Sequence, residues 1–346
     1  MQSSSSSCAT HAIAPSRVIR GERAWSESLN LIPALTRRPA LLGRSQATAD
    51  LRNQLQSDLN TVGVDSIQVE LEYDCCEHDL QRLQETLNSH GCDGVIAAGG
   101  GKVLDAGKLL ADRLKLSCIT VPLSAATCAG WTALSNIYST DGAFEGDVAL
   151  QRCPDLLVFD HSLVRQAPAR TLASGIADAL AKWYEASVSS GASNDGIIQQ
   201  AVQMARVLRD QLLLDAKEAL ENPKSEAWVR VAEACGLTAG VIGGLGGAQC
   251  RTVAAHAVHN GLTQLPACHH VLHGEKVGFG ILVQLRLEER LGGSQLAAQA
   301  FACKSIHLQR TLWSEFFALL QDLCVVSIAL QAFDCAMLRR LEVERG

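Results

Sequence analysis

Histidine is the residue type that stands out in this chain, because five of its ten histidines fall within 252–280. The five are His256, His259, His269, His270 and His273. Neutral imidazole is the commonest metal ligand in proteins, and it titrates near neutral pH, so the cluster predicts a metal site. A helix pair with polar surface positions is the alternative. It suits His269 and His270, which lie in a Pro-containing loop, better than it suits His256 and His273.

A metal site built on this cluster would need a carboxylate as well. One carboxylate and two imidazoles suit Zn²⁺ and leave a fourth position free for water or substrate. Asp178, on a helix expected to begin near Pro168, is a candidate, although spacing alone does not single it out among the acids of the chain. His259 follows His256 by three residues on the same helical face. It could contact substrate or the ligands, and an ordinary hydrogen-bonded histidine explains it equally well.

A second segment with chemical potential is AAGGGKVLD at 97–105. It follows an expected buried strand and opens an expected helix. Three glycines let the backbone approach a phosphate, and a helix N-terminus supplies free N–H groups and partial positive charge, to which Lys102 could add a full charge. The pattern is neither GxGxxG nor a P-loop. It predicts a phosphate-binding turn, with a flexible strand-to-helix turn as the alternative.

The elements that must position these residues change character near residue 160. Before it, short apolar runs alternate with helical periodicity, which predicts a parallel sheet with helices on both faces. We expect strands at 17–20, 40–42, 67–71, 94–98, 118–121, 133–139 and 156–159, and helices at 24–35, 47–59, 78–87 and 102–114. Beyond it the strand signal ends, and we expect helices from Pro168, at 194–220, 225–241, 252–262 and 275–290, and beyond Ser294.

This change predicts two domains of different class. An α/β dinucleotide-binding domain is expected at 15–160 and an all-helical, metal- and substrate-binding domain at 161–346. The Ser-rich tail at 1–14 is expected to be disordered. A cleft between two such domains is a natural ligand site.

Composition narrows the class of protein further. The 346 residues are 47% hydrophobic and 19% charged, which is enough for a sizeable core. The net charge of −6 argues against a nucleic-acid-binding surface, and no apolar run approaches the ~20 residues that span a membrane. The N-terminus lacks the pattern of a secretory signal, and the thirteen cysteines contain no CxxC pair. Reduced thiols and a cytoplasmic protein are therefore expected.

Four motifs together give the chain a family likeness. They are GGGKVLDAGK (99–108), TALSNIY (132–138), APARTLASGIADALAKWYEA (167–186) and AAHAVHNGLT with HGEKVGFG (within 255–280). Over about residues 15–290 the sequence resembles glycerol dehydrogenases, within the iron-containing alcohol dehydrogenase superfamily. The resemblance implies an N-terminal dinucleotide-binding α/β domain, an all-α C-terminal domain and an active site between them.

The resemblance also implies roles for particular residues. The metal ligands would be Asp178, His256 and His273. Lys182 stands where iron-using relatives carry a fourth ligand, a histidine, which favours Zn²⁺ over iron. The residues that would cradle the cofactor pyrophosphate are Gly99, Gly100, Gly101, Lys102 and Asp105, and those lining the nicotinamide end are Thr132, Leu134 and Tyr138. Zn²⁺ would bind the substrate hydroxyl and lower its pKa, and hydride would pass to the nicotinamide of NAD or NADP.

Two departures from the family pattern bear on specificity. Cys128 stands where glycerol dehydrogenases carry an aspartate that contacts the polyol, so a strong acceptor for substrate hydroxyls is replaced. A small packing residue is the favoured interpretation of Cys128, and a reactive cysteine the alternative. Arg44 follows the second strand where the family often has an acid near the adenosine 2′-OH. An arginine there is the change expected for a 2′-phosphate, so NADP could be accepted; the alternative is that Arg44 points into solvent.

The sequence therefore predicts a zinc-dependent NAD(P) dehydrogenase of a small alcohol or polyol. A dehydroquinate synthase-type lyase, a glycerol-1-phosphate dehydrogenase-like enzyme and a weakened non-catalytic relative remain as alternatives. The resemblance also implies a homo-oligomer. It is lost after about residue 292, which leaves the completeness of the helical domain open, and the sequence does not identify the alcohol.

Overall fold

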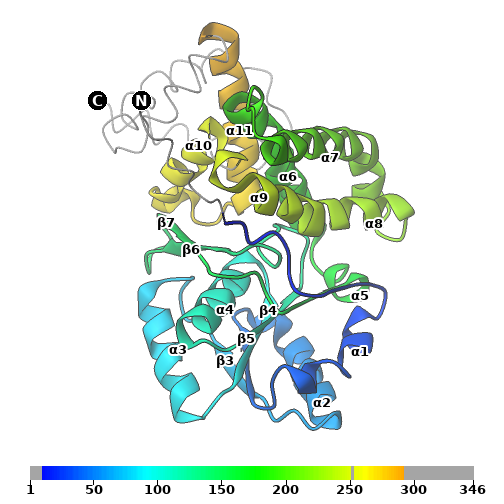
Figure 1. Cartoon of the computed structure of the whole chain (residues 1–346), viewed down its shortest axis with the longest axis vertical. Helices are drawn as coiled ribbons and strands as arrows, with labels where there is room; N and C mark the ends of the chain where they lie inside the picture. The colour runs from blue at the N-terminus through cyan, green and yellow to red at the C-terminus, as the bar shows by residue number, and fades with distance from the viewer. Residues whose placement is uncertain (1–9, 251–252, 292–346) are drawn as a thin grey trace, which may run out of the picture.

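A six-stranded parallel sheet forms the N-terminal half of the molecule (Figure 1). The computed structural model describes residues 10–250 and 253–291, so most of the serine-rich tail and the helix expected beyond Ser294 lie outside the described residues. The strand order is β1-β8-β5-β4-β2-β3. These strands are β1 (Val18–Gly21), β2 (Pro39–Gly43), β3 (Ile67–Glu70), β4 (Gly94–Gly99), β5 (Ser117–Pro122) and β8 (Leu156–Asp160).

Helices cover both faces of this sheet, as the sequence predicts. Along β2, Leu41 packs with the face that carries α1 (Ala24–Ser28) and α2 (Ala49–Thr61). Leu42 packs with the opposite face, under α3 (Glu77–Ser89) and α4 (Gly101–Leu114). Because both faces are buried, β2 and β4 are continuous apolar runs without polar alternation.

Two sequence expectations need correction in this half. The helix expected at 24–35 is wrong in length: α1 ends at Ser28, and only a 3₁₀ turn, η1 (Ile32–Ala34), follows. Pro33 accounts for this, because it donates no N–H and so cannot make the hydrogen bond to residue 29 that a continuing α-helix would need. The sequence also hid β7 (Phe144–Ala149), which pairs antiparallel with β6 (Leu134–Tyr138). Its alternation is between half-buried and exposed side chains, so it carries little apolar signal.

The chain after β8 is helical throughout the part that the structure describes. The helices are α5 (His161–Val164), α6 (Ala169–Ser190), α7 (Gly196–Glu221), α8 (Glu226–Glu233), α9 (Ala239–Gly246), α10 (Ala254–Thr263) and α11 (His273–Leu291). Short turns η4 (Gly247–Cys250) and η5 (Pro266–Cys268) flank α10. The expected helix at 225–241 is α8 and α9 joined by a π-helical turn, η3 (Ala234–Thr238).

The sheet and the helices share one core. Phe159 of β8 is fully buried in a cluster with residues of α6, α7 and α8, and a Cβ on Gly236 of the π turn would lie 2.4 Å from the Phe159 ring. The β6–β7 hairpin makes a second connection, because the backbone N–H of Phe144 donates to Thr263 Oγ1 of α10 at 2.9 Å. Figure 1 shows β6 and β7 between the sheet and α10.

The expectation that no apolar run approaches the length of a membrane span needs correction, because Glu226–Gly246 is long and apolar enough by length and composition. In the fold, 61% of its most apolar window is buried against the rest of the molecule. Core helices of folded domains pass the same test, so the stretch is accounted for by α8 and α9 packing in the shared core.

Close helix packing brings α10 and α11 against each other and against α6. A Cβ on Gly274 would lie 1.7 Å from the carbonyl oxygen of Ser174 in α6. A Cβ on Gly280 would lie 2.3 Å from the carbonyl oxygen of Ala255 in α10. Backbones at this separation admit no side chain, so α11 can reach both neighbours only through glycine.

Gly274→Ala should therefore lower the free energy of unfolding by about 1–3 kcal/mol, because the added methyl forces α11 away from α6. Denaturant unfolding monitored by circular dichroism measures the change. Gly196→Ala is the matched control, because nothing lies within 4 Å of a Cβ at that helical glycine. The control should be neutral or slightly stabilising. Equal stability of the two variants would contradict the packing argument.

Candidate metal centre and cofactor cavity

A cavity of about 1080 Å³ lies between the carboxyl edge of the sheet and the helices α6, α10 and α11. At the sheet, its wall includes the end of β4 and Arg44, the residue that follows β2, and the two strands are hydrogen-bonded neighbours. The chain leaves β2 towards β3 on one side and returns to β4 on the other, so this is a topological switch point. Such points are where parallel α/β sheets bind nucleotides.

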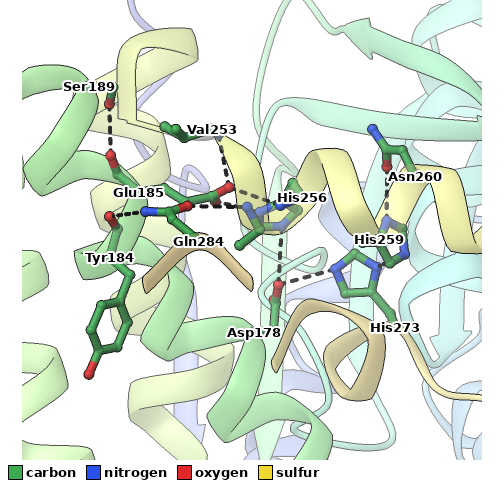
Figure 2. A network of polar contacts seen from close by, with 11 residues as sticks. Asp178, Tyr184, Glu185, Ser189, Val253, His256, His259, Asn260, His273 and Gln284 are labelled. Atoms are coloured by element: carbon green, nitrogen blue, oxygen red, sulfur yellow. Dashed lines mark hydrogen bonds and ion pairs between the residues drawn. The ribbon is translucent and has the colours of Figure 1, made fainter. Parts of the chain in front are cut away.

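The three predicted metal ligands meet at the helical end of this cavity (Figure 2). Asp178 comes from α6, His256 from the first turn of α10, and His273 is the first residue of α11. Asp178 Oδ1 lies 3.1 Å from His273 Nε2 and 3.5 Å from His256 Nε2. All three ligand atoms lie within 4.8 Å of one another, and one carboxylate with two imidazoles is a set that fits Zn²⁺.

The charges around this trio set the protonation of its side chains. Burial alone would raise the pKa of Asp178, but the charge of Lys182 and contacts with His273 and His256 hold it well below the usual range. Burial lowers the pKa of His256, yet the charge of Glu185 and hydrogen bonds to Asp178 and Glu185 outweigh it and raise the pKa to about 9. The carboxylate is therefore ionised at neutral pH, and the free His256 carries a proton that a metal would displace.

His259 lies against a ligand imidazole, where the sequence left its role open. Its Nε2 is 2.8 Å from His273 Nδ1, and its own Nδ1 is 2.8 Å from Asn260 Oδ1. Burial, followed by the charges of His273 and His256, holds the pKa of His259 well below its usual value, so this imidazole is neutral. If His273 offers Nε2 to a metal, its Nδ1–H donates to His259, and His259 donates in turn to Asn260.

Glu185 is a residue of this site that sequence reasoning missed. It is 1% exposed, and its Oε2 lies 2.5 Å from His256 Nδ1. Its position contained a usable signal, because Asp178, Lys182 and Glu185 are spaced i, i+4, i+7 on α6 and so share one helical face. Lys182 is also buried and lines the cavity.

Cys128 lines the cavity and is buried. Burial raises the pKa of its thiol, so it stays protonated at neutral pH. A thiol with a raised pKa is a poor nucleophile, which favours the packing interpretation over the reactive one. All nine cysteines among the described residues are free thiols.

The predicted phosphate-binding turn lies at the sheet end of the cavity. Gly99 ends β4, Gly100 precedes α4 and Gly101 begins it, so the free N–H groups of that helix face the same cavity. A Cβ on Gly101 would lie 2.9 Å from Thr127 Cγ2, so the turn is closely covered. Lys102 binds the Asp74 carboxylate and lies over the Tyr138 ring, 5.1 Å from its centre.

The other predicted cofactor residues also line the cavity, and some of their polar groups have partners already. Asp105 Oδ1 is 3.1 Å from Lys108 Nζ, and Asp105 Oδ2 accepts from the backbone of Asn136 at 3.3 Å. The Lys108 ammonium also donates to the carbonyl oxygens of Thr132 and Leu134. Asp105 and Lys108 therefore tie α4 to β6, the strand that carries Leu134 and Tyr138 to the cavity wall.

Arg44 follows β2, at the rim of the same cavity, and does not point freely into solvent. Its guanidinium lies 2.7 Å from Asp74 Oδ1, so the Asp74 carboxylate faces both Arg44 and Lys102. The Asp74 side chain is only 6% exposed, against 41% for Arg44. The sequence did not draw attention to Asp74.

Comparison with known proteins gives consistent matches. Residues 15–161 match the iron-containing alcohol dehydrogenase family. The chain is 36% identical over 267 residues to a glycerol dehydrogenase of Pseudomonas putida. This match covers 75% of this chain and 72% of that protein. It is 61% identical over 227 residues to an uncharacterized oxidoreductase of Synechocystis, where the match covers 66% of this chain but only 59% of the relative's length.

Among solved structures, the fold is similar to that of a probable glycerol dehydrogenase from Sinorhizobium meliloti. The TM-score is 0.71 at 30% identity, and the match covers 80% of this chain and 77% of that chain.

Zinc binding to the metal-free protein should release about one proton at pH 7, because His256 with its pKa near 9 must lose a proton to become a ligand. Below pH 9 the apparent zinc affinity should therefore rise with pH, by about tenfold per pH unit for one displaced proton. Titration calorimetry in two buffers of different ionisation enthalpy measures the proton count. A count near zero at pH 7 would rule out His256 as a protonated ligand.

Proposed function

Because the chain belongs to the iron-containing alcohol dehydrogenase family and is similar to its glycerol dehydrogenases, we propose that it is a zinc-dependent oxidoreductase that transfers a hydride between NAD(P) and a small alcohol or polyol. The observation that carries the proposal is the convergence of Asp178, His256 and His273 at one end of a cavity whose other end is the N-terminus of α4. The cytoplasmic location and the homo-oligomer stay predictions.

The chain's own residues divide the work between the two ends of the cavity. Asp178, His256 and His273 would hold the metal, and Gly99 to Gly101 would receive the cofactor pyrophosphate at the amides of α4. A metal held there would lower the pKa of a substrate hydroxyl so that its proton passes to water, and the carbon bearing that hydroxyl would give its hydride to the nicotinamide and become a carbonyl. Thr132, Leu134 and Tyr138, on or beside β6, would place the nicotinamide near the metal, and Cys128 and His259, which line the same cavity, would contact the substrate.

Zinc is proposed rather than iron because of Lys182. That residue lies one helical turn after Asp178, lines the cavity and carries a positive charge that stabilises the Asp178 carboxylate. An ammonium cannot ligate a metal, so α6 offers one ligand, and three protein ligands with an open position are the pattern of catalytic zinc.

NAD(P) specificity is proposed to depend on the Arg44–Asp74 pair. The Arg44 guanidinium at the rim of the cavity would attract the 2′-phosphate of NADP. The Asp74 carboxylate, which already pairs with that guanidinium, would repel the phosphate through like charge. The two residues act in opposite directions on the same part of the cofactor, so their substitutions should shift preference in opposite directions.

Zinc-loaded protein should reduce NAD or NADP with at least one of glycerol, 1,2-propanediol or a simple alcohol, and a chelator should abolish the reaction. Asp178→Asn should lower kcat by at least about 10²-fold, since it removes the carboxylate that lies between the two ligand histidines. Absorbance at 340 nm follows the reaction. Turnover that survives both the chelator and the substitution would contradict a metal-dependent mechanism, and phosphate release from a sugar-acid phosphate would point to a lyase instead.

Arg44→Asp should weaken NADP binding at least tenfold while changing NAD binding little, because the 2′-phosphate loses its cation and meets a second acid. Asp74→Asn should strengthen NADP binding relative to NAD. Fluorescence titration of the reduced cofactors measures both without turnover. The same fold-change for NADPH and NADH in both variants would show that the pair does not read the 2′ position.

A further inference from the structure

We propose that Glu185 is a metal-positioning residue: its buried carboxylate holds the His256 ring so that Nε2 faces Asp178, and it does so while fixing the first turn of α10. The inference rests on the metal site of the proposed function. It adds a residue that touches neither substrate nor cofactor in that scheme.

The geometry of Glu185 differs from that of an ordinary buried acid. Its Oε1 accepts the backbone N–H of Val253 at 2.8 Å and that of His256 at 2.9 Å. Its Oε2 lies 2.5 Å from Nδ1 of the same histidine (Figure 2). One carboxylate therefore binds both the backbone and the side chain of His256, which restricts the ring to a single position on α10.

This contact also selects the form of the imidazole. An ionised carboxylate only accepts hydrogen bonds, so the ring nitrogen facing it must carry a hydrogen. In the neutral ring, that leaves the lone pair on Nε2, the nitrogen that faces Asp178 Oδ1 at 3.5 Å. Carboxylate-to-histidine contacts of this kind orient metal-binding imidazoles and raise their basicity.

The two ligand histidines are supported by different means. His273 is backed by the neutral His259 and then by the amide oxygen of Asn260. His256 is backed by a carboxylate that is 1% exposed, so its support is the charged one. We therefore expect the loss of the Glu185 carboxylate to lower the affinity for the metal more than the loss of a residue that only connects the helices.

Gln284 provides the matched control for a structural role. It is fully buried on α11, its Oε1 accepts the N–H of Ala255 at 3.2 Å, and its Nε2 donates to the carbonyl oxygen of Tyr184 at 2.6 Å. Like Glu185, it ties the first turn of α10 to α6. None of its hydrogen bonds to described residues reaches the His256 ring, so its loss tests the helix connection alone.

The test compares Glu185→Gln and Gln284→Ala in the full-length protein. The new amide would turn its N–H group towards His256 Nδ1 and favour a hydrogen on Nε2, which opposes metal binding. We expect Glu185→Gln to weaken zinc binding about 10- to 100-fold, measured by competition with a chromophoric chelator, and to change the visible absorption of the Co²⁺ protein. Gln284→Ala should leave zinc affinity within about threefold of wild type, even if its melting temperature falls.

Unchanged zinc affinity and an unchanged Co²⁺ spectrum in Glu185→Gln would overturn the inference, as would an equal loss of affinity in Gln284→Ala. If Glu185→Gln does not fold, Glu185→Asp replaces it: this variant keeps the charge but shortens its reach, and it should bind zinc more weakly than wild type. Wild-type affinity in Glu185→Asp would then overturn the inference. Failure of the wild-type protein to bind zinc at all would overturn the proposed function together with it.

Discussion

The contact on which the rest of the helical region depends is the buried carboxylate of Asp178 between two imidazoles. A carboxylate withdrawn from water is costly unless positive or hydrogen-bonding groups surround it. Here those groups come from three different helices, with Lys182 on the same helix, His256 on α10 and His273 on α11. The arrangement can form only where the helix backbones approach closely, which is why Gly274 and Gly280 stand at their crossings.

The second constraint is that the site must face the open edge of the sheet. The π turn at 234–238 lets Gly236 pack on Phe159, so the helical region is joined to β8 through a common core. The β6–β7 hairpin crosses to α10 on the other side, through Phe144 and Thr263. Between these two connections lies the cavity, with the amides of α4 at one end and the histidines at the other.

The charges of the cavity differ between its two ends. At the sheet end, Arg44 and Lys102 both face the Asp74 carboxylate, and other acids, among them Glu72, Asp141 and Asp147, also line the cavity. An anion at this end would therefore rely on the amides of α4 as well as on the two cations. At the helical end, Asp178 and Glu185 supply two buried carboxylates, offset in part by Lys182. Because electrostatic interactions are stronger where water is excluded, these buried charges count most at the helical end.

The sequence by itself determined the parallel sheet, the helical second half and the family, because long apolar runs and motif spacing are local properties. It also drew attention to His256 and His273 by their density. It missed β7, whose burial comes from the hairpin and α10, and it extended a helix across Pro33. Only the tertiary structure brought Glu185 to His256, His259 to His273, and Asp74 to Arg44 and Lys102. In each of these pairs the two residues lie on different elements of the chain. Their hydrogen bonds and ion pairs therefore depend on how those elements pack, and the spacing of residues along the sequence does not show it. Local pattern can name a ligand, but only the packing of α6, α10 and α11 decides which way its ring faces.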